Sequence, residues 1–361
     1  MFGKIIGNPP IGVAGLSFEL LYFFCMKAIA LFSSIVFTFF SIEGKATNQP
    51  FDQLYTQLQD SLDKQDLKSA KKSAEVIVDI YQDHPMSPEV YFQLASLYLK
   101  EGEYEAAFEA VELYLKKDAT LRFYEEAYKI KLEVAHRYSK GFKKHIAGLR
   151  VLPKWMPAQE EAMDIYDEIQ AAVPRSDLAA EALYAKAALQ LHLQDYKGSL
   201  DSFQVFLKKF GQHALAPHAH IKIGDIYVVN TKTQQNDDSF LALERLNYQR
   251  FKDNFPSDPR LRIAEGQIKN IEEILANGMF EIAAYYKRTK RYDAALLYYT
   301  QVIQTYPKSV VAHKAVNTVQ YLREKYSDLK DKYPVEDLEI IVDVVEELPD
   351  IIQDQTDQKV R

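Results

Sequence analysis

One pattern of large and small residues occurs three times along the chain and restricts the fold more than any other feature. The most regular copy contains Ile282-Ala283, Tyr286, Tyr292, Ala295, Tyr299, Val302 and Pro307. The other two contain Leu94-Ala95, Tyr98, Gly102, Tyr104 and Ala107, and then Ala187, Gln190, Tyr196, Ser199, Phe203 and Phe206. Two helices cross closely only where one of them contributes a small residue, and large residues fill the wedge around that point. We therefore expect each copy to be a pair of crossed helices.

This spacing is that of the tetratricopeptide repeat (TPR), a helical hairpin that buries its apolar face only by stacking on its neighbours. The chain has 13 glycines and 14 prolines among 361 residues, a content that suits long helices, and strand-like alternation is almost absent. We predict an all-α fold, a TPR-type α-solenoid of about five to six stacked helical hairpins. Proteins of this kind hold other proteins.

The N-terminal segment indicates export. The charge-free apolar stretch 28–42 has the length of a signal-peptide core, about 7–15 residues, and is short for a membrane span of about 20. Met26 and Lys27 before it resemble a start and a basic n-region. We expect residues 1–46 to be an over-long N-terminus plus a signal peptide, with a true start at Met26 and a mature start near Thr47. An uncleaved N-terminal anchor is the alternative.

The rest of the chain divides by its helical pattern. We expect N-terminal TPR hairpins over residues 50–120 and further repeats over 121–334. Within the second part we expect a long helix over 121–144, a polar loop over 231–238 and a connecting helix over 259–275. Residues 335–361 form an acidic tail, which either caps the last repeat with a helix or docks a partner.

The sequence contains none of the common catalytic or nucleotide-binding motifs. A Walker A loop, a GxGxxG after a strand, an HExxH and a nucleophile elbow are all missing. We predict that the protein is not an enzyme and uses no cofactor or metal. His213, His218 and His220 are close in sequence, but only Asp225 is near enough to complete a metal site, and His220 is expected in the core. The lone Cys25 provides neither an intramolecular disulfide nor a Cys-based zinc site.

Nucleic acid is not expected as a partner, because the formal net charge is −7 and phosphate binding needs an excess of Lys and Arg. Protein partners are expected on the concave surface, which the first helices of TPR hairpins line. The candidate partner-binding residues on these helices are Phe92, Ser96, Leu99, Tyr184, Leu191 and Phe280. An exposed apolar row is costly in a monomer and indicates a bound peptide or helix. Coverage by a neighbouring helix is the alternative.

A second candidate surface is basic. Residues 129–154 contain eight Lys or Arg and a single acid, Glu133. Arg137, Lys140 and Lys144 share one face of the expected helix, and with Lys143 they form a candidate basic patch. Such a patch suits an acidic protein, the acidic tail or phospholipid head groups, and a solvated helix face is the alternative. Trp155, the only tryptophan, is expected in the core.

The C-terminal half resembles a known family. The relevant segments are 280–296, Val302-Ile303 with Tyr306-Pro307 and Ser309, 251–258, and 182–187 with Asp195-Tyr196. They are similar to the repeats of BamD, the outer-membrane assembly lipoprotein, over about residues 172–330. Envelope TPR proteins of the CpoB type share the tyrosine-proline endings. The hairpins before Leu121 are additions to the family pattern in this interpretation.

The resemblance implies a periplasmic, outer-membrane-associated scaffold. It would dock through its C-terminal repeats on the POTRA domains of a BamA-type protein and receive unfolded outer-membrane proteins. The family's lipidated cysteine has no counterpart here, because Cys25 lacks small residues before it. Membrane association is therefore expected through partners or an N-terminal anchor.

One family contact is changed. A basic residue of the last repeat docks on BamA in the family, and Tyr298 aligns there. We therefore take Tyr298 and the neighbouring cations Lys287, Arg288 and Lys290 as candidate docking residues. The alternatives to this whole interpretation are a general envelope TPR adaptor of the CpoB type and a cytoplasmic TPR secretion chaperone.

Overall fold

The computed structural model describes residues 50–117, 122–145, 153–234 and 237–326. The expected signal peptide and the acidic tail lie outside these described residues. The chain divides into two compact units between Thr56 and Gln57. Of the first unit only the beginning of α2 is described, and the packing discussed below is that of the second unit.

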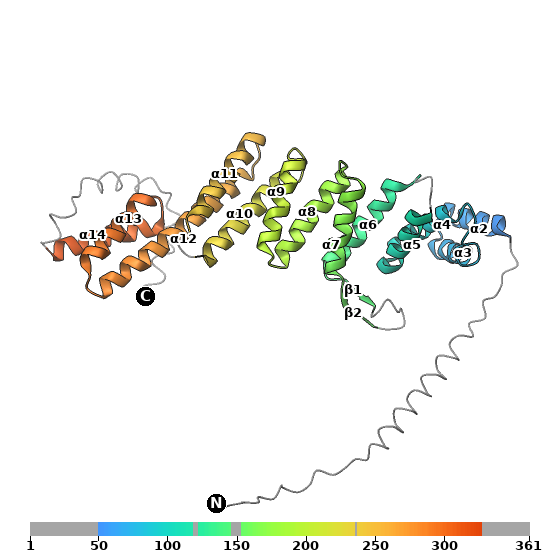
Figure 1. Ribbon diagram of the computed structural model, residues 1–361, viewed down its shortest axis with the longest axis horizontal. Helices are drawn as coiled ribbons and strands as arrows, with labels where there is room; N and C mark the ends of the chain where they lie inside the picture. Colours follow the sequence, from blue (N-terminus) through green and yellow to red (C-terminus); the bar gives the residue numbers. More distant parts are fainter. Residues whose placement is uncertain (1–49, 118–121, 146–152, 235–236, 327–361) are drawn as a thin grey trace, which may run out of the picture. The chain divides into compact units, whose positions relative to one another are not determined.

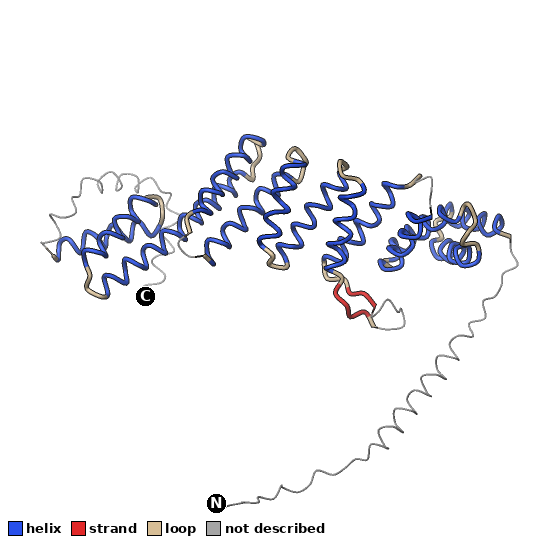
Figure 2. Tube along the Cα trace, in the orientation of Figure 1, coloured by secondary structure: helices blue, strands red, loops and turns tan. Residues whose placement is uncertain are grey.

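The described residues form thirteen helices and one two-stranded antiparallel ribbon, as Figures 1 and 2 show. The helices are α2 (Phe51–Asp63), α3 (Leu67–Ile80), α4 (Ser87–Glu101), α5 (Tyr104–Lys117), α6 (Tyr124–Ser139), α7 (Gln159–Ala172), α8 (Asp177–His192), α9 (Tyr196–Phe210), α10 (Ala216–Thr233), α11 (Ser239–Asn254), α12 (Leu261–Arg288), α13 (Tyr292–Thr305) and α14 (Val310–Lys325). The ribbon consists of β1 (Lys143–His145) and β2 (Lys154–Pro157). The predicted all-α, TPR-type fold is confirmed.

The two helices of each hairpin cross at the small residues that the sequence pattern predicts. The most extensive packing is between partners of one hairpin, α4 with α5, α8 with α9 and α12 with α13. Ala107, Ala283 and Ala295 have 0% exposed surface. In the irregular copy the Ser199 hydroxyl donates to the carbonyl of Ala187 across the crossing at 2.8 Å. The expected positions of the crossings are therefore confirmed.

Four hairpins share one turn conformation. The turn residue has a positive φ in each: Gln65 at 56°, Gly102 at 78°, Gln194 at 63° and Lys290 at 61°. The left-handed region is natural for glycine and uncommon for other residues. Only the α4–α5 hairpin carries the glycine that makes this turn visible in the sequence.

Three expected boundaries are wrong. The long helix expected over 121–144 is α6, which ends at Ser139, because Gly141 adopts φ 89° and turns the chain into β1. The connecting helix expected to end at 275 continues without a break to Arg288 as α12. The polar loop begins later than residue 231, because the buried Thr231 hydroxyl donates to the Tyr227 carbonyl at 2.8 Å and α10 reaches Thr233.

No helix within the described ranges is both long enough and apolar enough to cross a membrane.

Candidate functional site

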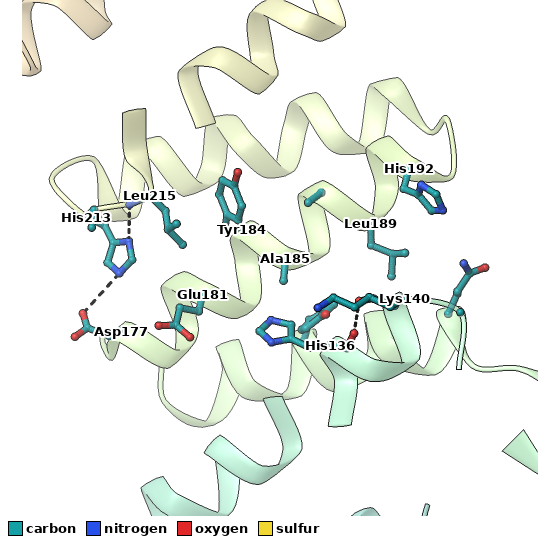
Figure 3. Close-up of a pocket in the computed structure, with 16 residues that line it drawn as sticks. His136, Lys140, Asp177, Glu181, Tyr184, Ala185, Leu189, His192, His213 and Leu215 are labelled. Carbon is teal, nitrogen blue, oxygen red and sulfur yellow. Dashed lines mark hydrogen bonds and ion pairs between the residues drawn. The ribbon is translucent and has the colours of Figure 1, made fainter. Parts of the chain in front are cut away.

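A large pocket lies where two neighbouring hairpins meet. Its volume is about 870 Å³, and its walls come from the end of α6, from α7 and α8, and from the turn between α9 and α10. Helix α8 supplies an apolar floor (Figure 3), which consists of the half-buried Tyr184, Ala185 and Ala188 and the buried Leu189. Helices of successive hairpins stack at an angle, so the floor residues lie in a cleft that neither hairpin has alone.

One end of this pocket is acidic. Asp177 and Glu181 are on successive turns of α8, and His213 faces them from the α9–α10 turn (Figure 3). The Leu215 backbone N–H donates to Nδ1 of His213 at 3.1 Å. The ring proton of a neutral His213 is therefore on Nε2, which points toward Asp177 Oδ1 at 4.0 Å.

The other end carries nitrogen-bearing side chains. Lys140 follows α6 and is exposed, and His192 is in the last turn of α8 (Figure 3). His136 lies between the two ends, with its ring 5.9 Å from that of Tyr166. Burial lowers the pKa of His136, so this ring is neutral at physiological pH and offers one donor and one acceptor.

Tyr184 connects the floor to the core. Its ring meets Phe203 edge-on at 5.5 Å and Phe206 at 5.8 Å. Burial raises the pKa of Tyr184, so the side chain is neutral. The aromatic packing fixes the ring from behind while part of it stays open to the pocket.

The other candidates on first helices are also half-buried, Phe92 against the residue that precedes α6 of the next hairpin and Phe280 against its own hairpin. Phe92 stacks on Phe123 at 4.6 Å, and Phe280 meets Tyr299 edge-on at 5.1 Å. Ser96, Leu99 and Leu191 are half-buried as well. Of the predicted partner-binding residues, Tyr184 lines the large pocket, together with Lys140 of the expected basic patch, and the others lie at separate hairpins.

The basic patch does not exist as one helical face. Arg137 is on α6 and pairs with Glu133 at 2.8 Å, whereas Lys144 is on β1 and donates to Glu161 at 2.8 Å. Lys140 follows the end of α6, and Lys143 begins β1. The expectation fails because the helix ends at Ser139 and the chain changes direction.

The C-terminal candidates surround the α12–α13 turn. Tyr298 is half-buried and stacks on Tyr286 with ring centres 5.5 Å apart and an interplanar angle of 12°. Lys287 is half-buried, and Lys290 is exposed in the turn itself. Arg288 lines a second pocket of about 520 Å³ between the end of α10 and α12.

The three histidines that are close in sequence separate in space. His213 lines the large pocket, and His218 lies 2.8 Å from an Arg260 nitrogen. His220 is 3% exposed, shares a hydrogen bond of 2.7 Å with Asn247 and stacks on Phe251 at 5.1 Å. It is a core residue, as expected. No three His, Cys, Asp or Glu side chains converge as a metal ion would need anywhere in the described ranges.

Sequence reasoning missed most of the polar lining of the large pocket. His136, Asp177 and His192 were not singled out, and His213 was considered only as a metal ligand. These residues come from helix ends and from a turn, and they meet only because one hairpin stacks on the next. No motif in the sequence predicts that these residues lie close together.

The family comparison agrees with the resemblance that we drew. Residues 47–146 match the YfiO family, described as an outer membrane lipoprotein. The match covers the N-terminal hairpins, which we had treated as additions, and it ends before the segment 172–330 on which the resemblance was based. A search among curated proteins gave no match.

The solved structures with similar folds are TPR proteins, and their sequences are only distantly similar to this chain. A tetratricopeptide repeat protein from Parabacteroides merdae ATCC 43184 has 16% identity and a TM-score of 0.35, with 75% of this chain and 98% of that chain covered. The C-terminal part of a TPR repeat-containing protein from Cytophaga hutchinsonii has 14% identity and a TM-score of 0.34, covering 74% and 99%. PilF of Pseudomonas aeruginosa has 15% identity and a TM-score of 0.30, covering 73% and 95%.

The fold assignment rests on the hairpins themselves, since these likenesses are weak. The family match is confined to the N-terminal hairpins, over residues 47–146. Residues 47–146 of this TPR-type chain carry the domain of the outer membrane lipoprotein family YfiO, to which BamD belongs.

Proposed function

We propose that this protein is a scaffold of outer-membrane protein assembly in the periplasm. It docks on a BamA-type POTRA protein through its C-terminal hairpins and takes up segments of unfolded outer-membrane proteins in the pocket between α6, α7 and α8. Its role is binding and not catalysis. The observation that carries the proposal is the YfiO match on a stack of TPR-type hairpins.

The shape of the large pocket supports the client-binding half of the proposal. Its apolar floor suits an aliphatic or aromatic side chain, and its ends differ in charge, with Asp177 and Glu181 at one and Lys140 at the other (Figure 3). An extended segment places its backbone polar groups against such ends and its side chain on the floor. The pocket does not require a particular amino-acid sequence in the bound segment, and this suits a protein that binds many different clients.

The surface near the α12–α13 turn supports the docking half. Tyrosine and arginine are the residues that most often dominate binding energy at protein interfaces. Tyr298 is held by the Tyr286 ring, so little side-chain freedom remains to be lost on binding. Exposed Arg288 and Lys290 add positive charge beside it.

Calorimetric titration of the full chain with the organism's own POTRA fragment tests the docking. We expect Tyr298→Ala to weaken binding by more than about 1 kcal/mol, the size typical of an interface anchor. Higher salt should weaken it only modestly, because screening acts on the cationic contacts alone. Tyr321→Ala is the matched control, since Tyr321 is a 54% exposed tyrosine on α14. Absence of binding by the unchanged chain at low and high salt would favour a general envelope adaptor.

Filling the pocket tests client binding separately. Ala185 is half-buried in the pocket floor, and Ala185→Trp occupies that space with an indole ring. We expect this variant to lose binding of an unfolded outer-membrane barrel protein, measured by fluorescence anisotropy of the labelled client. Ala242→Trp on the exposed face of α11 is the control. Equal client affinity for both variants would exclude this pocket as the client site.

A further inference from the structure

The β1–β2 ribbon carries the only tryptophan of the chain on its surface. Trp155 was expected in the core and is 71% exposed, and the next residue, Met156, is 51% exposed. The ribbon emerges beyond the ends of α6 and α7 (Figure 1). Two large apolar side chains at successive positions, both exposed to water, are costly, so their exposure needs an explanation.

An irregular register explains why Trp155 is not covered. Lys144 pairs with Met156 and His145 pairs with Lys154, so β2 has one residue more than β1 between these pairs. That extra residue is Trp155. A bulge of this kind leaves its residue without a cross-strand partner and re-aims its side chain.

The base of the ribbon is nonetheless held firmly. The His145 backbone N–H donates to Glu105 on α5 at 2.6 Å, and Lys144 donates to Glu161 on α7 at 2.8 Å. The Phe142 ring meets the Tyr104 ring edge-on at 5.1 Å. These contacts fix β1 to helices of two hairpins, so the exposure of Trp155 follows from the fold and not from a loose end.

The sequence before Trp155 is rich in basic residues. No acidic residue occurs in the sequence between Glu133 and Glu160. Arg137 and Lys144 are occupied by Glu133 and Glu161. Lys140 and Lys143 are exposed, and among the described residues they make no ion pair, so their charges remain available.

We propose that this ribbon binds an anionic phospholipid surface. Trp155 and Met156 enter the interfacial region of the bilayer, where an indole ring places its apolar body among the acyl chains and its N–H near the head groups. Lys140 and Lys143 meet the lipid phosphates. The acidic residue Glu161 does not oppose this contact, because Lys144 pairs with it, and Glu105 is engaged by the His145 backbone N–H.

A lipid surface fits this site better than a folded protein does. A stable protein interface buries about 800 Å² on each partner and needs a complementary shape. Two apolar side chains and two cations on a narrow ribbon offer much less area, and a bilayer requires no matching shape. The contact adds a membrane-binding element to the protein and does not rest on the proposed scaffold function.

The lone tryptophan makes a direct experiment available, because all tryptophan fluorescence of the full chain comes from residue 155. Phosphatidylcholine vesicles with a minor fraction of phosphatidylglycerol should shift the emission to shorter wavelength, and brominated acyl chains should quench it. Vesicles of phosphatidylcholine alone should give a much smaller change. The readout is the environment of Trp155 and not capture of the chain, since the apolar residues 28–42 alone could bring it to vesicles.

Charge variants make the test specific. Lys140→Gln with Lys143→Gln should weaken the vesicle-dependent shift about 30-fold in lipid concentration, at about 1 kcal/mol for each basic residue near an anionic surface. Lys208→Gln with Lys209→Gln on exposed α9 removes the same charge elsewhere and should leave the shift unchanged. Unchanged Trp155 emission on vesicle-bound protein, or an equal loss in both double variants, would overturn the proposal. A shift seen only with an acidic protein would overturn it as well.

Discussion

At the residue scale, the most unusual group is Glu244, a carboxyl with 0% exposed surface on α11. Its Oε2 accepts from the Asn247 amide at 3.0 Å. Its Oε1 and the Oε1 of Gln267 both lack a hydrogen-bond donor, and both lie close above Gly224, where a Cβ would come within 2.8 Å and 2.3 Å of them. Two facing acceptors are satisfied together when Glu244 carries a proton.

Burial, reinforced by the charge of Asp225, raises the pKa of Glu244 to about 8. The same carboxyl titrates near 4.5 in the unfolded chain. Between these values the folded state binds more protons, so the stabilising contribution of Glu244 is full below about pH 4.5 and is lost as the pH rises through about 8.

Glu244→Gln should therefore remove this pH dependence. The amide keeps the hydrogen bond with Asn247 and supplies an N–H to Gln267, without a charge at any pH. We expect the variant to melt above the unchanged protein at about pH 9 and to differ little at about pH 5. Melting temperatures measured from about pH 5 to about pH 9 test this prediction. Glu324→Gln on the exposed face of α14 is the control. A pH profile parallel to that of the unchanged protein would mean that Glu244 is not protonated.

A second residue-scale prediction concerns the helix crossings. Ala295 has 0% exposed surface where α13 crosses α12. Ala295→Leu should overpack the crossing and cost about 1–3 kcal/mol of unfolding free energy. Denaturant unfolding measures this cost, and Ala242→Leu on exposed α11 controls for the added leucine. An unchanged midpoint for Ala295→Leu would show that the crossing is assigned to the wrong residue.

At the element scale, a buried lysine connects three helices. Lys131 on α6 has 0% exposed surface and pairs with Glu112 on α5 and Glu168 on α7. Its ammonium also lies 5.2 Å from the centre of the Phe108 ring. The charge is compensated from two sides, so one side chain holds the end of one hairpin to the next.

Lys131→Ala should weaken this connection. Removing one partner from a buried pair typically costs about 3–5 kcal/mol. Glu112 and Glu168 remain 45% and 44% exposed, so water screens them and we expect a smaller loss of about 1–3 kcal/mol. Lys129→Ala, whose pair with Glu125 is on the surface, should cost less than about 1 kcal/mol. Equal losses in chemical unfolding would contradict a special role for Lys131.

The helices also differ in how well their positions could be predicted from the sequence. The hairpins α4–α5 and α12–α13 were predictable because the small residue at a crossing cannot be enlarged, which leaves a periodic trace. The end of α6 was missed because the helical spacing of side chains in the sequence continues to Lys144, whereas the chain turns at Gly141, which has a positive φ. The large pocket was missed in most of its polar lining because His136, Asp177 and His213 meet through stacking, which no local pattern encodes.

At the scale of the whole molecule, two kinds of evidence fall on different parts of the chain. The YfiO match covers residues 47–146, whereas the tyrosine-proline repeats that resemble BamD occupy the C-terminal half. A stack of hairpins allows this, because each repeat contacts mainly its neighbours and different repeats can serve different partners. The proposed scaffold uses the central pocket for clients and the last hairpins for docking.

The most direct measurement places a photoreactive amino acid at position 298 of the full-length protein in its own cells. We predict a cross-link to a POTRA-bearing barrel-assembly protein, found by mass spectrometry. The same probe at Lys252, exposed on α11, should give none. A cross-link from position 298 only to other envelope proteins, or equal products from both positions, would contradict the proposed docking.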